Sequence, residues 1–172
     1  MSEFSNLEKR VYTIATAHLD TVWLWDLNHT IKMCIPATLN KNFELFEKYP
    51  EYSFSFEGAY RYELMEEYHP ELFEKMLEYQ KKGRWHPTGS LYENGDWNIP
   101  SAEAHFRNVL YGNDYFEKTF GKPCIDLYLP DCFGFGWVLP SVAAHSGCKA
   151  FMTKKLSESD PYGIPLDRKS VV

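Results

Sequence analysis

Short apolar runs alternate with amphipathic stretches along the chain, and this pattern predicts strands separated by helices. Runs rich in β-branched and aromatic residues, bounded by turn-prone residues, are typical of strands. Stretches in which apolar residues recur every three or four positions are typical of helices that bury one face. The strands are predicted at 11–17, 52–56, 84–88, 125–129 and 150–155, and the helices at 31–48, 60–82, 101–120 and 139–146.

Prolines, glycines and one serine predict where these helices begin, break and end. Pro36 is expected to bend its helix or delay its start, and Pro70 to break the next helix or occupy a first turn. Gly83 and Gly121 are placed to end helices, and Ser101 is placed as an N-cap.

The order of the elements predicts the topology of the sheet. Helices of this length between strands imply right-handed βαβ crossovers, so the predicted fold class is α/β with a mainly parallel sheet. Ligands of such sheets bind beyond the carboxyl ends of the strands. The candidate functional segments are therefore 18–20, 92–96, 130–135 and 154–155.

Composition narrows the function classes. The 172 residues suffice for one domain with a core, and the formal net charge of −6 argues against a nucleic-acid partner. No apolar run approaches membrane-spanning length, and the first residues lack a signal-peptide pattern, so we expect a cytoplasmic location without a membrane partner. The 4 cysteines show no CxxC spacing and favour reduced thiols over a disulfide pair. The 5 Trp, 12 Tyr and 12 Phe mostly predict core, and they mildly favour a carbohydrate ligand.

Two segments carry candidate metal ligands. His18 and Asp20 follow the first predicted strand, and an imidazole nitrogen with a carboxylate oxygen suits Zn²⁺. Alone, this spacing is more typical of a helix cap beside a surface histidine. Asp131 follows the fourth predicted strand in PDCFGFG, where Gly134 and Gly136 allow close backbone turns; a Pro-Asp turn explains this motif equally well.

Taken together, the motifs resemble a known family. TAHLDTVWLW, FEGAYRYELM, GRWHPTGSLYENGDWNIPSAEAHFRNVLYG, LPDCFGFGWVLPSVAAHSG and FMTKKLS, in this order, closely resemble glycoside hydrolase family 38, the α-mannosidases. The resemblance covers about 11–164. It implies a zinc-dependent retaining α-mannosidase that hydrolyses α-mannosidic bonds in glycans. It also implies a seven-stranded β/α barrel, of which this chain would form an incomplete, amino-terminal part.

The resemblance also implies roles for individual residues. His18, Asp20 and Asp131 would bind zinc, and Asp131 would also be the nucleophile. A carboxylate that is bound to zinc and lies near a cation stays ionised, as a nucleophile must. The substrate-binding positions are an aromatic wall at Trp23, a basic residue beside the nucleophile at Lys155, and a polar loop at Asp96.

Each substrate-binding position has a plainer interpretation. Trp23 could fill the core, Lys155 could be an exposed lysine at a strand end, and Asp96 could form a turn. The chain also departs from the family at Lys154, where a glutamine is common; a second positive charge there could alter substrate fit.

Length is the larger departure. In the family, a further zinc-binding histidine and the general acid, an aspartate, lie beyond Val172, so we expect the chain to be inactive by itself. We assign 1–166 to the amino-terminal part of the catalytic domain. Residues 167–172 fit no core pattern and match a translated sequencing adapter, so we interpret them as a non-native tail.

Two other functions stay open from the sequence. A metal-dependent polysaccharide deacetylase also places His and Asp at strand ends, and acetyl release from chitin oligomers would identify it. A non-catalytic sugar-binding fragment is the other. The sequence determines neither the preferred linkage nor the oligomeric state.

Overall fold

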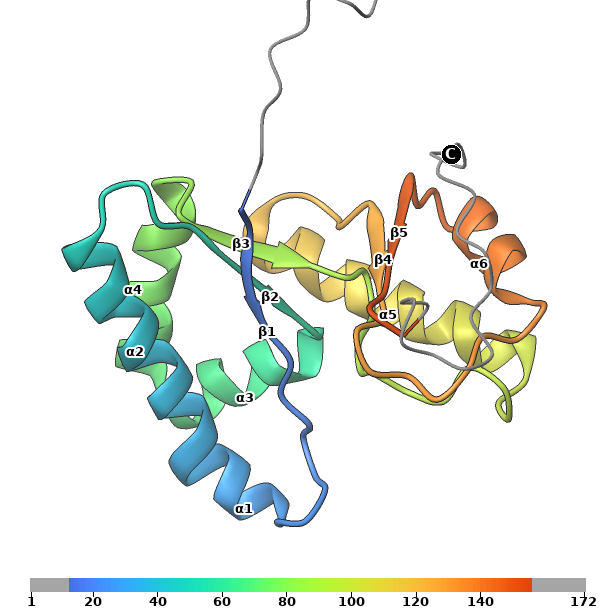
Figure 1. Cartoon of the computed structure of the whole chain (residues 1–172), viewed down its shortest axis with the longest axis horizontal. Coiled ribbons are helices and arrows are strands. Elements are labelled where there is room, and N and C mark those ends of the chain that lie inside the picture. The colour runs from blue at the N-terminus through green and yellow to red at the C-terminus, as the bar shows by residue number, and fades with distance from the viewer. Residues whose placement is uncertain (1–12, 156–172) are drawn as a thin grey trace, which may run out of the picture.

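The computed structural model describes residues 13–155, in which short parallel strands alternate with helices (Figure 1). The strands are β1 (Ala15–Ala17), β2 (Phe54–Glu57), β3 (Trp85–Thr88), β4 (Asp126–Tyr128) and β5 (Ala150–Met152). The α-helices are α1 (Leu27–His29), α2 (Ile35–Lys48), α3 (Ala59–Tyr68), α4 (Pro70–Lys81), α5 (Ala102–Phe120) and α6 (Leu139–His145). Residues 11–12 of the first predicted strand and the tail at 167–172 lie outside the described residues.

The described strands form two parallel sheets. One has the order β1-β2-β3, with Ala17 opposite Phe56 and Phe56 opposite Pro87, and the other pairs β4 with β5. The predicted parallel pairing and helical crossovers are confirmed. A single sheet was expected, but the ladder is interrupted between β3 and β4, where the Asp126 carboxylate accepts hydrogen bonds from Thr88 Oγ1 and Gly89 N. The seven-stranded barrel stays a prediction.

The first long helical segment shows how the chain accommodates Pro36. Between α1 and α2, residues Thr30–Cys34 form a π-helix, and Ile35 N donates to Thr30 O. A proline inside a regular α-helix would clash with the carbonyl four residues earlier. The wider π-turn ends just before the proline, so α2 starts with Pro36 in its first turn.

The other predicted helix ends are confirmed. Pro70 begins α4 after α3 ends at Tyr68, and Ser101 Oγ accepts from Ala104 N at the start of α5. Gly121 ends α5 with a left-handed φ of 76°. No helix among residues 13–155 has the length and apolar character needed to cross a bilayer.

Two hydrophobic cores lie side by side, and α5 contributes to both. Phe116 of α5 belongs to the core formed by α2, α3, α4 and the three-stranded sheet, where Trp85 packs against Phe54 and Phe56. Val109 of the same helix belongs to the core beneath β4 and α6. Helix α5 runs behind the strands and so connects the two cores (Figure 1).

Candidate active site

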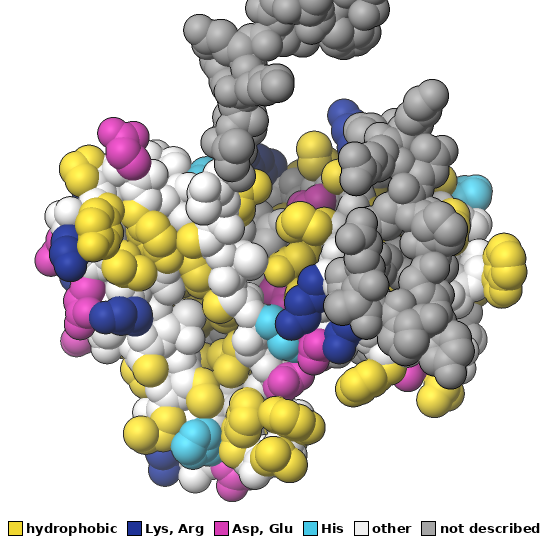
Figure 2. Space-filling view, viewed as in Figure 1, with side chains coloured by type: hydrophobic (Ala, Val, Ile, Leu, Met, Phe, Trp, Pro, Cys, Tyr) yellow, Lys and Arg dark blue, Asp and Glu magenta, His cyan; other side chains and the backbone are white. Residues whose placement is uncertain are grey.

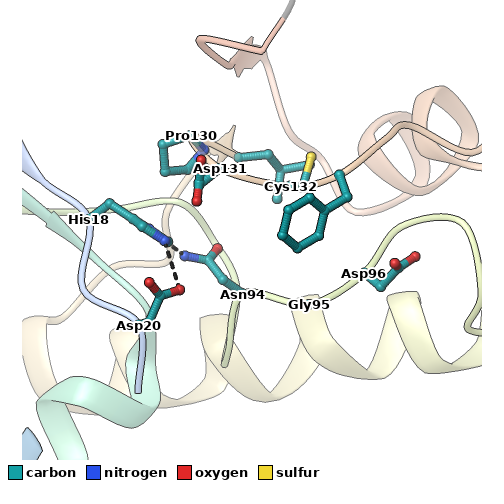
Figure 3. Close-up of a pocket in the computed structure, with 10 residues that line it drawn as sticks. His18, Asp20, Asn94, Gly95, Asp96, Pro130, Asp131 and Cys132 are labelled. Carbon is teal, nitrogen blue, oxygen red and sulfur yellow. Dashed lines mark hydrogen bonds and ion pairs between the residues drawn. The ribbon is translucent and has the colours of Figure 1, made fainter. Parts of the chain in front are cut away.

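The carboxyl ends of the strands meet around one pocket. His18 follows β1, Glu57 ends β2, Asn94 lies in the loop after β3, Asp131 follows β4, and Lys155 follows β5. A space-filling view shows histidine, acidic and basic side chains gathered where the two sheets adjoin (Figure 2). The pocket is about 260 Å³ in volume, and Figure 3 shows its lining: His18, Asp20, Asn94, Gly95, Asp96, Leu129, Pro130, Asp131, Cys132 and Phe133.

His18 lies between two carboxylates. Its Nδ1 is 2.7 Å from Glu57 Oε1, and its Nε2 is 3.2 Å from Asp20 Oδ1. The hydrogen bond to Glu57 raises the pKa of His18 above its usual value, against the opposing effect of burial. Asp20 meets His18 because the chain leaves the strand after Ala17, so residues two apart can turn toward one point.

Glu57 is buried, with 1% of its side chain exposed. Its Oε1 also accepts a hydrogen bond of 2.7 Å from Asn94 Nδ2, whereas its buried Oε2 has no hydrogen-bond partner among residues 13–155. This side chain therefore joins the ends of β1 and β2 to the loop that follows β3.

A buried arginine clamps the backbone beside the pocket. Arg61, 1% exposed, donates from Nε to Leu19 O and forms an ion pair of 2.8 Å with Glu93 Oε1. Glu93 Oε2 in turn accepts from Thr21 Oγ1. These contacts hold the segment that carries His18 and Asp20 against the segment that carries Asn94.

Asp131 faces two lysines across the pocket. Its Oδ1 lies 2.6 Å from Lys155 Nζ and 4.0 Å from Lys154 Nζ. The hydrogen bond from Lys155 holds the pKa of Asp131 below its usual value. Asp131 therefore stays ionised at neutral pH, with a cation on one side and His18 on the other.

The glycines of PDCFGFG lie at close contacts between loops and do not adopt an unusual backbone conformation. Neither Gly134 nor Gly136 has a positive φ. A Cβ on Gly134 would overlap Asn98 Nδ2, and one on Gly136 would lie 2.5 Å from Trp97 O. The loop after β4 is thus packed directly on the loop after β3, and the two form one rim.

Two of the predicted substrate-binding residues lie away from the ion pairs. Trp23 does not line the pocket and is 66% exposed, so it does not fill the core formed by residues 13–155; it packs edge-on against Trp25. Asp96 lines the far end of the pocket from His18 and also forms a turn, since its Oδ1 accepts from Asn98 N and Ile99 N (Figure 3). Asp96 therefore forms the expected turn while it lines the pocket, and its contact with substrate stays a prediction. The Cys132 sulfur is turned away from His18 and Asp20.

The donor chemistry suits zinc, but the ligands are not gathered around one point. His18 and Asp20 lie side by side and Asp131 lines the same pocket. Within residues 13–155, no group of three or more His, Cys, Asp or Glu side chains is close enough to hold a metal ion. The oriented His18–Asp20 pair is the part of the expected ligand set that the structure assembles.

Sequence reasoning missed Glu57 and Arg61, and it included Glu93 only as part of the candidate segment 92–96. The signal for Glu57 was available, because it is the last residue of a buried parallel strand, where functional groups are expected. The segment after the second strand was not included among the candidates. No sequence signal distinguishes Arg61, on a helix, from an ordinary surface arginine.

Comparison with known proteins gives a consistent family. The sequence model of the glycosyl hydrolases family 38 N-terminal domain matches residues 8–169. "Alpha-mannosidase G" of Dictyostelium discoideum is 37% identical over 153 residues, or 89% of this chain. "Alpha-mannosidase 2C1" of Homo sapiens is 33% identical over 86% of the chain, and "Alpha-mannosidase" of Saccharomyces cerevisiae is 32% identical over 94%. The chain spans only 14%, 14% and 15% of these three relatives.

A solved structure shares the fold. The crystal structure of an alpha-mannosidase from Enterococcus faecalis V583 superposes with a TM-score of 0.72 at 23% identity. The match covers 81% of this chain and 16% of that one.

Proposed function

This chain belongs to glycosyl hydrolase family 38, and we propose that it supplies the nucleophile and most of the metal ligands of a zinc-dependent retaining α-mannosidase acting on glycans. One observation carries the proposal: Asp131, held ionised by Lys155, shares a pocket with the oriented His18–Asp20 pair. An ionised carboxylate is what nucleophilic attack on a sugar requires, and the neighbouring His18–Asp20 pair would supply metal ligands. The mannoside class comes from the family and its named relatives.

Zinc would be held by His18, Asp20 and Asp131. When bound, it acts as a Lewis acid that holds sugar hydroxyls and stabilises negative charge at the site. The hydrogen bond from His18 Nδ1 to Glu57 leaves Nε2 on the side of Asp20, which supports a nitrogen and an oxygen ligand at this place.

The protein groups have separate roles in the proposed reaction. An Asp131 carboxylate oxygen attacks the anomeric carbon, forming an ester as the bond to the leaving oxygen breaks. A separate acid protonates that oxygen, and water then hydrolyses the ester with the configuration retained. Lys155 keeps Asp131 ionised before attack, and Asp96 would contact the sugar at the far end of the pocket. Trp23 stays a proposed aromatic wall for the sugar, although it does not line the pocket.

We propose that the general acid and one further zinc-binding histidine come from outside this chain. Asp96 does not serve as the acid, because it lies at the far end of the pocket and its Oδ1 is engaged in a turn. The isolated chain should then not cleave glycosides, since loss of acid catalysis alone costs a factor of about 10²–10⁴ in rate.

Zinc content and turnover test the proposal together. In a complete enzyme that contains this domain, His18→Ala and Asp20→Ala should each remove zinc and abolish hydrolysis of nitrophenyl α-mannoside while the fold persists. Stoichiometric zinc with normal turnover in both variants would refute the ligand assignment. Release of nitrophenol by the isolated chain, lost in Asp131→Asn, would show that the acid lies within it. Initial formation of the β-anomer by the complete enzyme would exclude Asp131 as nucleophile.

A further inference from the structure

We propose that Glu57 is a positioning residue, which fixes the ring orientation and the tautomer of His18 so that Nε2 is the nitrogen presented to the pocket. The geometric part of this inference is independent of zinc. Its consequence for metal affinity rests on the function proposed above.

Strand register brings the two side chains together. Ala17 of β1 pairs with Phe56 of β2, so His18 and Glu57 are the next residues along two adjacent parallel strands. Neighbouring positions in paired strands place their side chains on the same face of the sheet. The resulting distance of 2.7 Å between His18 Nδ1 and Glu57 Oε1 is that of a charge-assisted hydrogen bond.

The hydrogen-bond donors around Glu57 assign the proton on His18. An ionised carboxylate only accepts, so His18 Nδ1 must carry the hydrogen at this contact. Asn94 Nδ2 donates to the same Glu57 Oε1 at 2.7 Å. Asn94 Nδ2 and His18 Nδ1 are therefore two donors to one acceptor oxygen, which explains why they lie 3.4 Å apart. The lone pair of the neutral ring then lies on Nε2, on the side of Asp20.

The burial of Glu57 argues against a purely structural role. Its side chain is 1% exposed, yet Oε2 has no hydrogen-bond partner among residues 13–155. A buried carboxylate with an unpaired oxygen destabilises a fold relative to a well-packed apolar residue. Such a local cost is expected where a side chain serves a site.

The opposite tautomer would disable His18 as a ligand. With the hydrogen on Nε2, the ring would donate to Asp20 Oδ1 and present no lone pair to the pocket. Without Glu57 the ring loses the acceptor that distinguishes its two nitrogens. Outer-shell partners of ligating histidines typically contribute a factor of about 10–100 to metal affinity.

The experiment compares Glu57→Gln, Glu57→Leu and a control, Glu63→Gln, in the 172-residue chain. Gln keeps an acceptor oxygen, and Leu keeps the approximate volume without one. Glu63 is a carboxylate on α3 that accepts from Tyr92 Oη and does not line the pocket. Thermal melting establishes that each variant is folded.

Two measurements decide the proposal. Long-range ¹⁵N–¹H spectra of the His18 ring, above its titration, should show hydrogen on Nδ1 in the parent chain, Glu57→Gln and Glu63→Gln, and a tautomer mixture in Glu57→Leu. Competition with a chromophoric chelator should give Glu57→Leu a zinc affinity about 10–100-fold below the parent. The zinc affinity of Glu57→Gln should be several-fold below that of the parent, because the amide keeps an acceptor oxygen but lacks the negative charge. The zinc affinity of Glu63→Gln should equal that of the parent.

The outcomes separate this proposal from the proposed function. Hydrogen on Nε2 in the parent, or an unchanged tautomer in a folded Glu57→Leu, would overturn the positioning role. A fixed tautomer that is lost in Glu57→Leu, in a chain that binds no zinc, would support positioning and contradict only the predicted effect on zinc affinity; the zinc assignment itself is decided in the complete enzyme. If Glu57→Leu does not fold, the Gln variant decides: zinc affinity equal to the parent would overturn the proposal.

Discussion

Lys155 Nζ lies 2.6 Å from Asp131 Oδ1, and each side chain keeps about a third of its surface in water, 36% and 34% respectively. An ion pair this exposed contributes little to folding, typically about 0–1 kcal/mol. Its main effect is on protonation, because the cation favours the charged form of the carboxylate and lowers its pKa. The contact therefore matters to the chemistry of Asp131 more than to the stability of the fold.

Replacing Lys155 by Met should raise the pKa of Asp131, whereas Lys155→Arg should leave it low. Because the folded-state pKa is depressed, Asp131 stays ionised until the pH falls through that value, and loss of the cation moves protonation to higher pH. Titration of the Asp131 carboxyl carbon by NMR measures this shift. In a complete enzyme, Lys155→Met should move the acidic limb of the pH–rate profile to higher pH, while the melting temperature stays unchanged. Identical titrations in both variants would remove Lys155 from the site.

Arg61→Met should destabilise the chain by about 3 kcal/mol, because it breaks a buried ion pair with Glu93. This value is at the lower end of the range for broken buried ion pairs, since Glu93 is 32% exposed. The removed guanidinium also releases Leu19 O, so the segment bearing His18 should gain mobility. Denaturant unfolding gives the stability, and hydrogen exchange at 18–21 gives the mobility. In a double-mutant cycle with Glu93→Gln, additive losses would show that the pair is not coupled.

Gly112→Ala should destabilise α5 packing by about 1–3 kcal/mol. A Cβ there would lie 2.4 Å from Leu91 C and 2.5 Å from Ser90 O, which are backbone atoms that cannot rotate away. Gly95→Ala is the matched control, because nothing lies within 4 Å of its added Cβ and its φ is not positive. Chemical denaturation of both variants should show a loss only for Gly112→Ala. An equal loss in both would mean that packing against 90–92 is not the cause.

His105 should make the chain less stable as the pH falls below about 6.5. Its ring is buried and stacks on Trp97 with centroids 4.2 Å apart, and this burial lowers its pKa. The unfolded state therefore binds a proton that the folded state rejects, so stability is lost on acidification. His18, whose pKa is raised, contributes with the opposite sign.

The variant His105→Phe isolates this contribution, because Phe keeps a stacked ring that cannot titrate. Denaturant unfolding between about pH 5 and 7.5 should show a smaller decline for His105→Phe than for the parent chain. Parallel curves for the two proteins would show that His105 binds protons equally in the folded and the unfolded state.

The elements were predictable because their signals are local. Periodicity and turn residues located the strands and helices to within a few positions, and Ser101, Pro70 and Gly121 act where they were expected. The π-helix before Pro36 was not predicted. The sequence shows that the helix must accommodate a proline, but it does not show that a wider turn at Thr30–Cys34 will do so. The cytoplasmic location and the barrel stay predictions.

The pocket was predictable in part. The rule that ligands bind at strand ends led to His18, Asp131 and Lys155, which the structure places around one cavity or its rim. Between the two sheets, the Asp126 side chain accepts hydrogen bonds where a backbone ladder would continue, and no periodicity encodes such an exchange. The role of Glu57 could not be predicted from local signals either. Its partner His18 is 39 residues away in the sequence, and the two side chains meet only because of the register between β1 and β2.

The close packing of Gly134 on Asn98 and of Gly136 on Trp97 O has a consequence for engineering this pocket. A residue with a side chain at 136 would meet the backbone oxygen of Trp97, and one at 134 would require the Asn98 side chain to move, so a change in one loop should disturb the other. Loop grafts that aim at a different sugar should therefore transfer 94–98 and 131–136 as one cassette. Directed evolution that varies both segments together would allow the two surfaces to stay complementary.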